Sequence, residues 1–122
     1  MAMILKILVL LVGALFLLIG LVGVFQPAQL AASFGFELPT AESVGQMRAM
    51  IGAHYVAMGA VCVFAALRNH PILLVPIAAI EVTMLLTRVV AAINGEFTNA
   101  VIAPTLIEVV AAGILVAAAR RR

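Results

Sequence analysis

Six side chains that carry charge or exchange hydrogen bonds fall within long apolar runs of the sequence. A lone charge at the centre of a bilayer costs at least about 2.5 to 3.5 kcal/mol, so such residues normally face neighbouring helices and pair with one another. An arginine guanidinium grips a carboxylate through two parallel hydrogen bonds. We therefore predict a polar cluster within the membrane, which is a candidate for ligand binding or for a purely structural role. Its members are Arg48, His54, Tyr55, Glu81, Arg88 and Glu108.

Helical spacing supports this cluster. Glu81 and Arg88 are seven residues apart, and so are Arg48 and Tyr55. Seven residues bring a helix back to within about 20° of the same face, two turns further along. The last apolar run contributes Glu108. We expect the carboxylates to bind both guanidinium groups, with the Tyr55 hydroxyl completing the hydrogen bonds.

Three roles for the cluster follow from its chemistry. A satisfied set of ion pairs can simply fix the register of the helices, which is the interpretation that needs fewest assumptions. Alternatively, Arg48 and Arg88 line the mouth of a pocket for a small anionic or amphipathic ligand, or Glu81, Glu108 and His54 form a proton path. We expect His54 to be a hydrogen-bonded core histidine, because a haem held by two histidines would need a second one at that depth.

Composition sets the class of protein. The chain has 122 residues, of which 66% are hydrophobic and 10% charged, whereas a soluble domain is about half apolar and a quarter charged. These values exclude a soluble enzyme, a disordered tail and a nucleic-acid-binding module. The single cysteine, Cys62, cannot form a disulfide within one chain. The sequence has no metal-binding, nucleotide-binding or catalytic motif, so we predict no metal site, no cofactor of its own and no catalytic residues.

The apolar runs predict an all-α integral membrane protein. Each span needs roughly 20 apolar residues, and the chain supplies four such runs. The first is too long for a signal peptide, so we expect a retained helix. Short turns make consecutive helices antiparallel, which predicts an antiparallel four-transmembrane-helix bundle in which residues 1–122 form a single transmembrane domain. The predicted spans are 3–25, 41–67, 71–93 and 97–119, with a short interfacial helix at 27–33.

Charge outside the spans predicts the orientation. Lys6, Arg68 and the terminal arginines at 120–122 fall on one side, whereas Glu37, Glu42 and Glu96 fall on the other. Basic residues accumulate on the cytoplasmic side of membrane proteins. Both termini are therefore predicted to be cytoplasmic.

Small residues recur every four positions in two of the spans. Ala49, Ala53 and Ala57 show this spacing in the second span, and Gly113 and Ala117 show it in the fourth. Small residues at this interval let helix backbones approach closely in lipid. We predict that these residues form the packing faces within the bundle.

Several segments together resemble a known superfamily. They are FQPAQLAASFGF after the first span, QMRAMIGAHYVAMGA in the second, LLTRVVAAINGEF at the end of the third, and Glu108 in the last. Their order and spacing resemble the DoxX-like superfamily, and the chain is most similar to an uncharacterised bacterial family within it, a domain of unknown function. The resemblance implies that Arg48, Arg88 and Glu108 occupy recurring polar positions. It also implies a compact bundle in the bacterial inner membrane, and some members take part in quinone-coupled sulfur oxidation or membrane redox systems.

Three functions are consistent with these features. We first expect a non-enzymatic accessory or scaffold subunit that contacts membrane lipids and packs against a larger membrane complex or a second copy of itself. The alternatives are a binder or carrier of a small amphipathic ligand, such as a quinone or lipid, and a subunit of a membrane redox system. A cavity of a few hundred Å³ that reaches the arginines would favour the binder.

Overall fold

The computed structural model describes residues 1–121, so the last of the three terminal arginines, Arg122, lies outside the described residues. The described chain contains helices and no strands. Four helical segments are long and apolar enough to cross a membrane: Met3–Phe25, Ala41–Leu67, Pro71–Ile93 and Asn99–Ala119. This confirms the predicted fold class and identifies an integral membrane protein. The fourth segment begins two residues later than predicted, at a single turn of 3-10 helix, η3 (Asn99–Val101).

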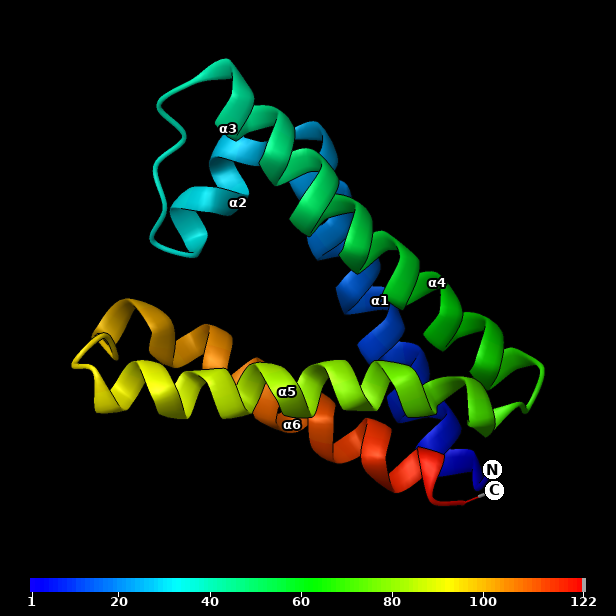
Figure 1. The fold of residues 1–122 in the computed structure, drawn as a ribbon. Helices are drawn as coiled ribbons and strands as arrows, with labels where there is room; N and C mark the ends of the chain where they lie inside the picture. The colour runs from blue at the N-terminus through cyan, green and yellow to red at the C-terminus, as the bar shows by residue number, and fades with distance from the viewer. Residues whose placement is uncertain (122) are drawn as a thin grey trace.

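The four segments are arranged as two helical hairpins that diverge from one end (Figure 1). In the first hairpin, α1 (Met3–Phe25) packs along its length against α4 (Ala53–Leu67). In the second, α5 (Leu74–Ile93) packs against α6 (Ile102–Ala119). The two hairpins meet at the end that carries both termini and separate toward α2 (Pro27–Ser33) and α3 (Ala41–Gln46). The fold is therefore wedge-shaped, with its open side at the far end from the termini.

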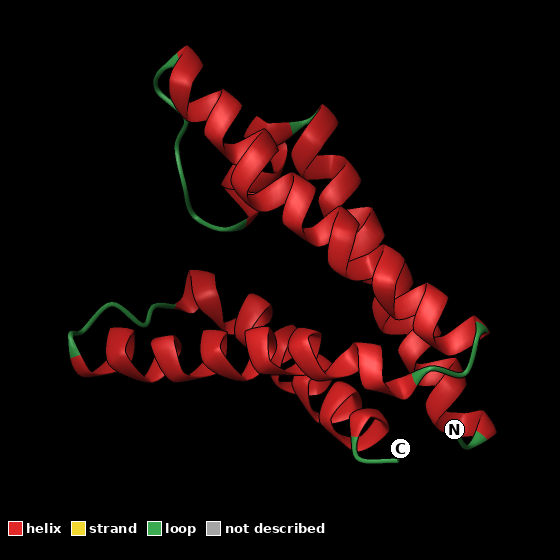
Figure 2. Cartoon of the chain, turned by 45° about the vertical axis from the view of Figure 1, so that its right-hand side comes forward, coloured by secondary structure: helices red, strands yellow, loops and turns green. Residues whose placement is uncertain are grey.

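The hydrophobic core lies at the closed end of the wedge. All four long helices contribute fully buried side chains to it, including Val9, Cys62, Leu74 and Leu115. The N-terminal ammonium of Met1 donates a hydrogen bond to the Asn69 side-chain oxygen, with a nitrogen–oxygen distance of 2.9 Å, and so joins α1 to the turn before α5. Figure 2 shows this turn and the C-terminus at the same end. The described basic residues used to predict orientation, Lys6, Arg68, Arg120 and Arg121, are thus on one side of the molecule.

Glycines, rather than the predicted alanines, bring α1 and α4 together. A Cβ at Gly20 would come within 2.8 Å of the Gly52 carbonyl oxygen, and a Cβ at Gly59 would come within 2.7 Å of the Gly13 carbonyl oxygen. The two backbones therefore touch along a line that we call the glycine seam, formed by Gly13, Gly20, Gly23, Gly52 and Gly59.

The predicted small-residue faces are consequently wrong. The alanines of the second span, at 49, 53 and 57, are exposed, and so are Gly113 and Ala117 on α6. A Cβ added at Gly113 would meet no atom of another described element within 4 Å. Residues seven apart and residues four apart both return to a similar face of a helix. The glycines of the seam follow the first spacing and the alanines follow the second, so the sequence contained two candidate packing faces.

Helix ends follow local sequence signals. Thr40 caps α3: its side chain accepts a hydrogen bond from the Ser43 backbone N–H, and the Ser43 hydroxyl accepts one from the Thr40 N–H, at 3.1 Å each. Asn69 adopts a left-handed conformation with φ 55° in the turn before Pro71, and Pro71 then begins the 3-10 turn η2 (Pro71–Leu73). Pro104 lies in the first turn of α6, where its missing N–H leaves no gap inside the helix.

One irregularity in the second span is absent from the predictions. Between α3 and α4 the chain forms six residues of π-helix, η1 (Met47–Gly52), in which the Ala53 N–H donates to the Arg48 carbonyl. A π-helix bonds residues five apart, so each residue rotates less about the axis than in an α-helix. The face of Arg48 is therefore turned away from the face of Tyr55, although both lie on one continuous helical segment.

Candidate functional site

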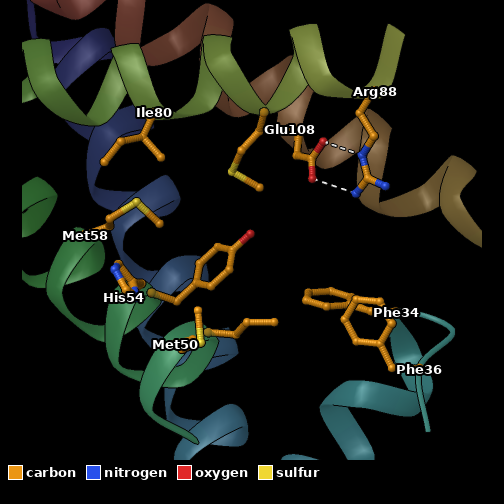
Figure 3. A pocket seen from close by; sticks show the side chains of 11 residues that line it. Phe34, Phe36, Met50, His54, Met58, Ile80, Arg88 and Glu108 are labelled. Carbon is orange, nitrogen blue, oxygen red and sulfur yellow. Dashed lines mark hydrogen bonds and ion pairs between the residues drawn. The ribbon is translucent and has the colours of Figure 1, made fainter. Parts of the chain in front are cut away.

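A cavity of about 330 Å³ lies between the two hairpins (Figure 3). The first hairpin contributes residues of η1 and α4, the second contributes residues of α5 and α6, and the segment after α2 contributes two phenylalanines. Most of these side chains are apolar, and the charged pair of Arg88 and Glu108 lies on the wall formed by the second hairpin. A largely apolar pocket with a few convergent polar groups is the usual form of a small-molecule site. Its lining residues are Phe34, Phe36, Met50, Ile51, His54, Tyr55, Met58, Ile80, Met84, Arg88 and Glu108.

Arg88 and Glu108 form the polar wall of this cavity. The Arg88 Nε donates to the Glu108 Oε2 at 3.0 Å, and its terminal nitrogen donates to Oε1 at 2.8 Å. This two-point geometry holds both side chains rigidly and joins α5 to α6. The Glu108 side chain is 6% exposed and that of Arg88 is 29% exposed, so the arginine faces the cavity more openly. Within residues 1–121, this pair is the one contact of the expected kind, a carboxylate bound to a guanidinium group.

Glu81 lies deeper and is unpaired. Its side chain is completely buried, and neither carboxylate oxygen has a hydrogen-bond partner among residues 1–121. A second, small cavity of about 30 Å³ adjoins it, with Tyr55, Glu108 and Phe34 in its walls. The same three residues also line the large cavity, so the two spaces are neighbours. The prediction that Glu81 binds a guanidinium group is wrong. Glu81 lies two helical turns before Arg88 on α5, toward the end at which the hairpins converge.

Tyr55 and His54 both reach the large cavity from α4. The ring of Tyr55 packs edge-on against Phe16 of α1, with ring centroids 5.4 Å apart and an interplanar angle of 72°. Tyr55 therefore stands between the first hairpin and the polar wall. His54 is exposed rather than a core histidine, because the wedge leaves that face of α4 open.

Arg48 does not join the cluster. Its guanidinium donates a hydrogen bond to the Val24 carbonyl oxygen near the end of α1, and Arg48 is not among the residues that line the large cavity in the described chain. Pro27 has no N–H, so the last carbonyls of α1 lack part of their usual donors. A positive charge is also favourable at a helix C-terminus. Arg48 thus acts as a cap on α1, and the rotation through η1 is what directs it there.

Substituting Arg48 with alanine tests this capping role. We expect Arg48→Ala to lower the free energy of unfolding by about 1 kcal/mol, the usual contribution of a charged donor at a helix C-terminus. The loss should appear in reversible sodium dodecyl sulfate titrations followed by circular dichroism. Arg68→Ala, which removes an exposed arginine from a turn, is the matched control. Equal stability of the two variants would contradict the cap.

Phe34 and Phe36 line the pocket but were not predicted as site residues. Phe34 and Phe36 flank Gly35, which has φ +80° and turns the chain after α2. Their rings meet edge to face at a centroid distance of 6.2 Å. Figure 3 shows both rings opposite the Arg88–Glu108 pair. The spacing of two aromatic residues about a glycine in a loop was the available signal, but this spacing alone does not predict a pocket wall.

No group of three or more His, Cys, Asp and Glu side chains that could hold a metal ion is found in residues 1–121. The fold and the site together define a small four-helix membrane protein with a polar-walled cavity between two hairpins. Residues 4–119 match the family model described as Domain of unknown function (DUF4345), and the chain belongs to this family. No curated protein and no solved structure matched the chain.

Proposed function

We propose that this protein binds a small amphipathic molecule in the cavity between its hairpins. The observation that carries the proposal is the cavity itself, with a volume of about 330 Å³ and apolar walls that meet one ion-paired polar wall. The cavity size matches that of small-molecule sites, which begin at about 300 Å³. The apolar walls suit a hydrocarbon or ring system, and the polar wall suits a head group, as in a quinone or lipid.

The lining supports a ligand that is held by shape and polarizability. Met50, Met58 and Met84 contribute flexible thioether side chains from both hairpins. Methionine adapts to irregular apolar surfaces and is common on surfaces that accept several ligands. The Arg88 guanidinium uses two of its five N–H donors on Glu108. The remaining N–H donors of Arg88 are available to a ligand head group, and the ion pair with Glu108 holds them in a fixed position.

Tyr55 gives a direct measurement of binding. It is the sole tyrosine of the chain, which has no tryptophan, and it lines the cavity. We expect a short-tailed ubiquinone analogue to quench Tyr55 fluorescence saturably in detergent micelles, because a quinone bound in the cavity lies next to the phenol ring. Quenching that rises without saturation, as for free N-acetyltyrosinamide in the same micelles, would contradict a quinone site.

A pair of variants on α5 controls for nonspecific partitioning. Ile80→Phe places a ring in the cavity wall, whereas Val82→Phe places the same ring on an exposed face two residues away. We expect Ile80→Phe to weaken saturable quenching by about fivefold or more, consistent with roughly 1 kcal/mol of lost interaction. Val82→Phe should bind like the parent protein. Equal effects of both variants would place the probe outside the cavity.

Further parts of the proposal concern the cellular setting. We propose that the protein resides in the bacterial inner membrane with both termini cytoplasmic, supported by the basic residues at one end of the wedge. A relationship to the DoxX-like superfamily, and through it to membrane redox systems, rests on the resemblance of the polar positions. A role as an accessory or scaffold subunit, in a homo-oligomer or a larger membrane complex, is supported by the exposed small-residue face of the second span, which includes Ala49, Ala53 and Ala57.

A further inference from the structure

We propose that the ligand of this cavity is a monocationic amphiphile and that the Glu81 carboxylate is its counterion. This inference rests on the proposed binding function and names the chemical class of the ligand. The charges on the cavity walls, the shape of the small cavity and the aromatic residues around it each support a cation.

One carboxylate at the site, that of Glu81, has no compensating charge among the described residues. Arg88 and Glu108 neutralise each other at 2.8 Å, which leaves Glu81 completely buried without a partner among the described residues. A buried carboxylate is costly unless a positive charge or hydrogen-bond donors compensate it. Arg48, the other arginine predicted for the cluster, is bound to the Val24 carbonyl. A ligand with one positive charge would supply what the chain lacks.

The same charges disfavour an anion. The sequence suggested that two arginines open the site to anionic ligands, but one is outside the cavity and the other is paired with Glu108. The other titratable groups beside Glu81 and the cavity are Tyr55 and His54 on α4, with Cys62 in the adjoining core. An anionic head group would therefore meet the unpaired carboxylate, while the positive charge of Arg88 is already balanced by Glu108.

Geometry allows a head group to approach Glu81. The small cavity beside Glu81 has a volume of about 30 Å³, more than the roughly 10 to 15 Å³ that a water molecule requires. An ammonium group is similar in size to water. Because the small and large cavities share Phe34, Tyr55 and Glu108, a bound molecule can place its head beside Glu81 and its apolar tail in the larger space.

Aromatic rings line both the small cavity beside Glu81 and the large cavity next to it. Phe16, Phe34 and Tyr55 line the small cavity, and Phe36 stands beside Phe34 in the large one. The faces of aromatic rings attract cations, with interactions of about 2 kcal/mol or more when water is excluded. Four of the chain's seven aromatic residues thus gather at this site. A neutral ligand would gain less from both the rings and the carboxylate.

The test compares two probes that differ in charge. Octylammonium and 1-octanol are titrated into the full chain in phosphatidylcholine nanodiscs at pH 7 by isothermal titration calorimetry, with empty nanodiscs as the blank. We expect octylammonium to bind about tenfold more tightly than octanol, which corresponds to roughly 1.4 kcal/mol. In Glu81→Gln, an isosteric neutral variant, octylammonium should bind only as tightly as octanol, whose own affinity should be unchanged.

Glu96→Gln is the matched control, since it removes a carboxylate from an exposed turn away from both cavities, and it should preserve the tenfold preference. Equal binding of both probes to the parent protein, or a preference that survives Glu81→Gln, would overturn the cationic ligand and leave the binding function standing. Absence of saturable binding by either probe would also overturn the cationic ligand, and together with non-saturable quenching by the quinone it would overturn the binding function itself. Circular dichroism of each variant establishes that it is folded.

Discussion

Gly20→Leu is expected to disrupt the first hairpin. A side chain at this position would run into the backbone of η1 at Gly52 and of α4 at Val56, and a backbone cannot move aside as a flexible side chain can. Overpacking a core by a few methylene groups costs about 1 to 3 kcal/mol, and we expect at least the upper value here. Reversible sodium dodecyl sulfate titration followed by Tyr55 fluorescence should show the loss as a lower unfolding midpoint.

Gly113→Leu is the control for this substitution. It makes the same change within a transmembrane helix, but a Cβ there meets no atom of another described element within 4 Å. Replacing glycine in a helix removes a conformational cost of up to about 1 kcal/mol, so this variant should be as stable as the parent protein or slightly more stable. If the two leucine variants unfolded at the same midpoint, α1 and α4 would not be packed through the glycine seam.

Arg88→Leu is expected to destabilise the second hairpin. It leaves the Glu108 carboxylate, in a residue that is 4% exposed, without the two donors that it has in the structure. Removing one partner of a buried ion pair costs about 3 to 5 kcal/mol, because the other charge remains buried and uncompensated. The free energy of unfolding in mixed micelles should fall by about the lower of these values, since Arg88 is partly exposed.

The double variant Arg88→Leu/Glu108→Leu separates the ion pair from the packing of the side chains. Replacing both charges by apolar groups of similar size is often neutral, so we expect the second substitution to restore most of the lost stability. Arg68→Leu, in an exposed turn, should change stability by less than about 0.5 kcal/mol. A double variant less stable than Arg88→Leu alone would contradict the assignment of this pair as an isolated charge pair.

The fold class could be predicted from the sequence because it depends on features that are continuous along the chain. Apolar runs of the required length, a capping threonine at Thr40 and prolines such as Pro71 in first turns specify where helices lie. These signals act within one helix or one turn. They are therefore independent of which helix packs against which.

The candidate site could be predicted only in part, because pairing depends on how helices face one another. The prediction that carboxylates bind guanidinium groups holds for Arg88 and Glu108, which lie on adjacent antiparallel helices. The spacing of seven residues had placed Glu81 on the face of Arg88 and did not single out Glu108 as its partner. The position of Arg48 was wrong because the π-helical segment η1 alters the rotation between Arg48 and Tyr55, and no residue pattern marked that segment. Glu81 was placed in an ion pair because the positive and negative charges within the spans are equal in number. This balance does not reveal where along the helices the two hairpins separate.

The wedge has a consequence for thermodynamics in the bilayer. Its apolar cavity lies among helices long and apolar enough to cross a membrane, so we expect lipid acyl chains to fill the volume that a bound molecule leaves free. Association is then an exchange in which a ligand displaces lipid, and the bilayer competes with it. Apparent affinity should vary with acyl-chain length and unsaturation even when every contact to the protein is unchanged. Dissociation constants for this protein consequently have meaning only when expressed as mole fractions in a bilayer of stated composition.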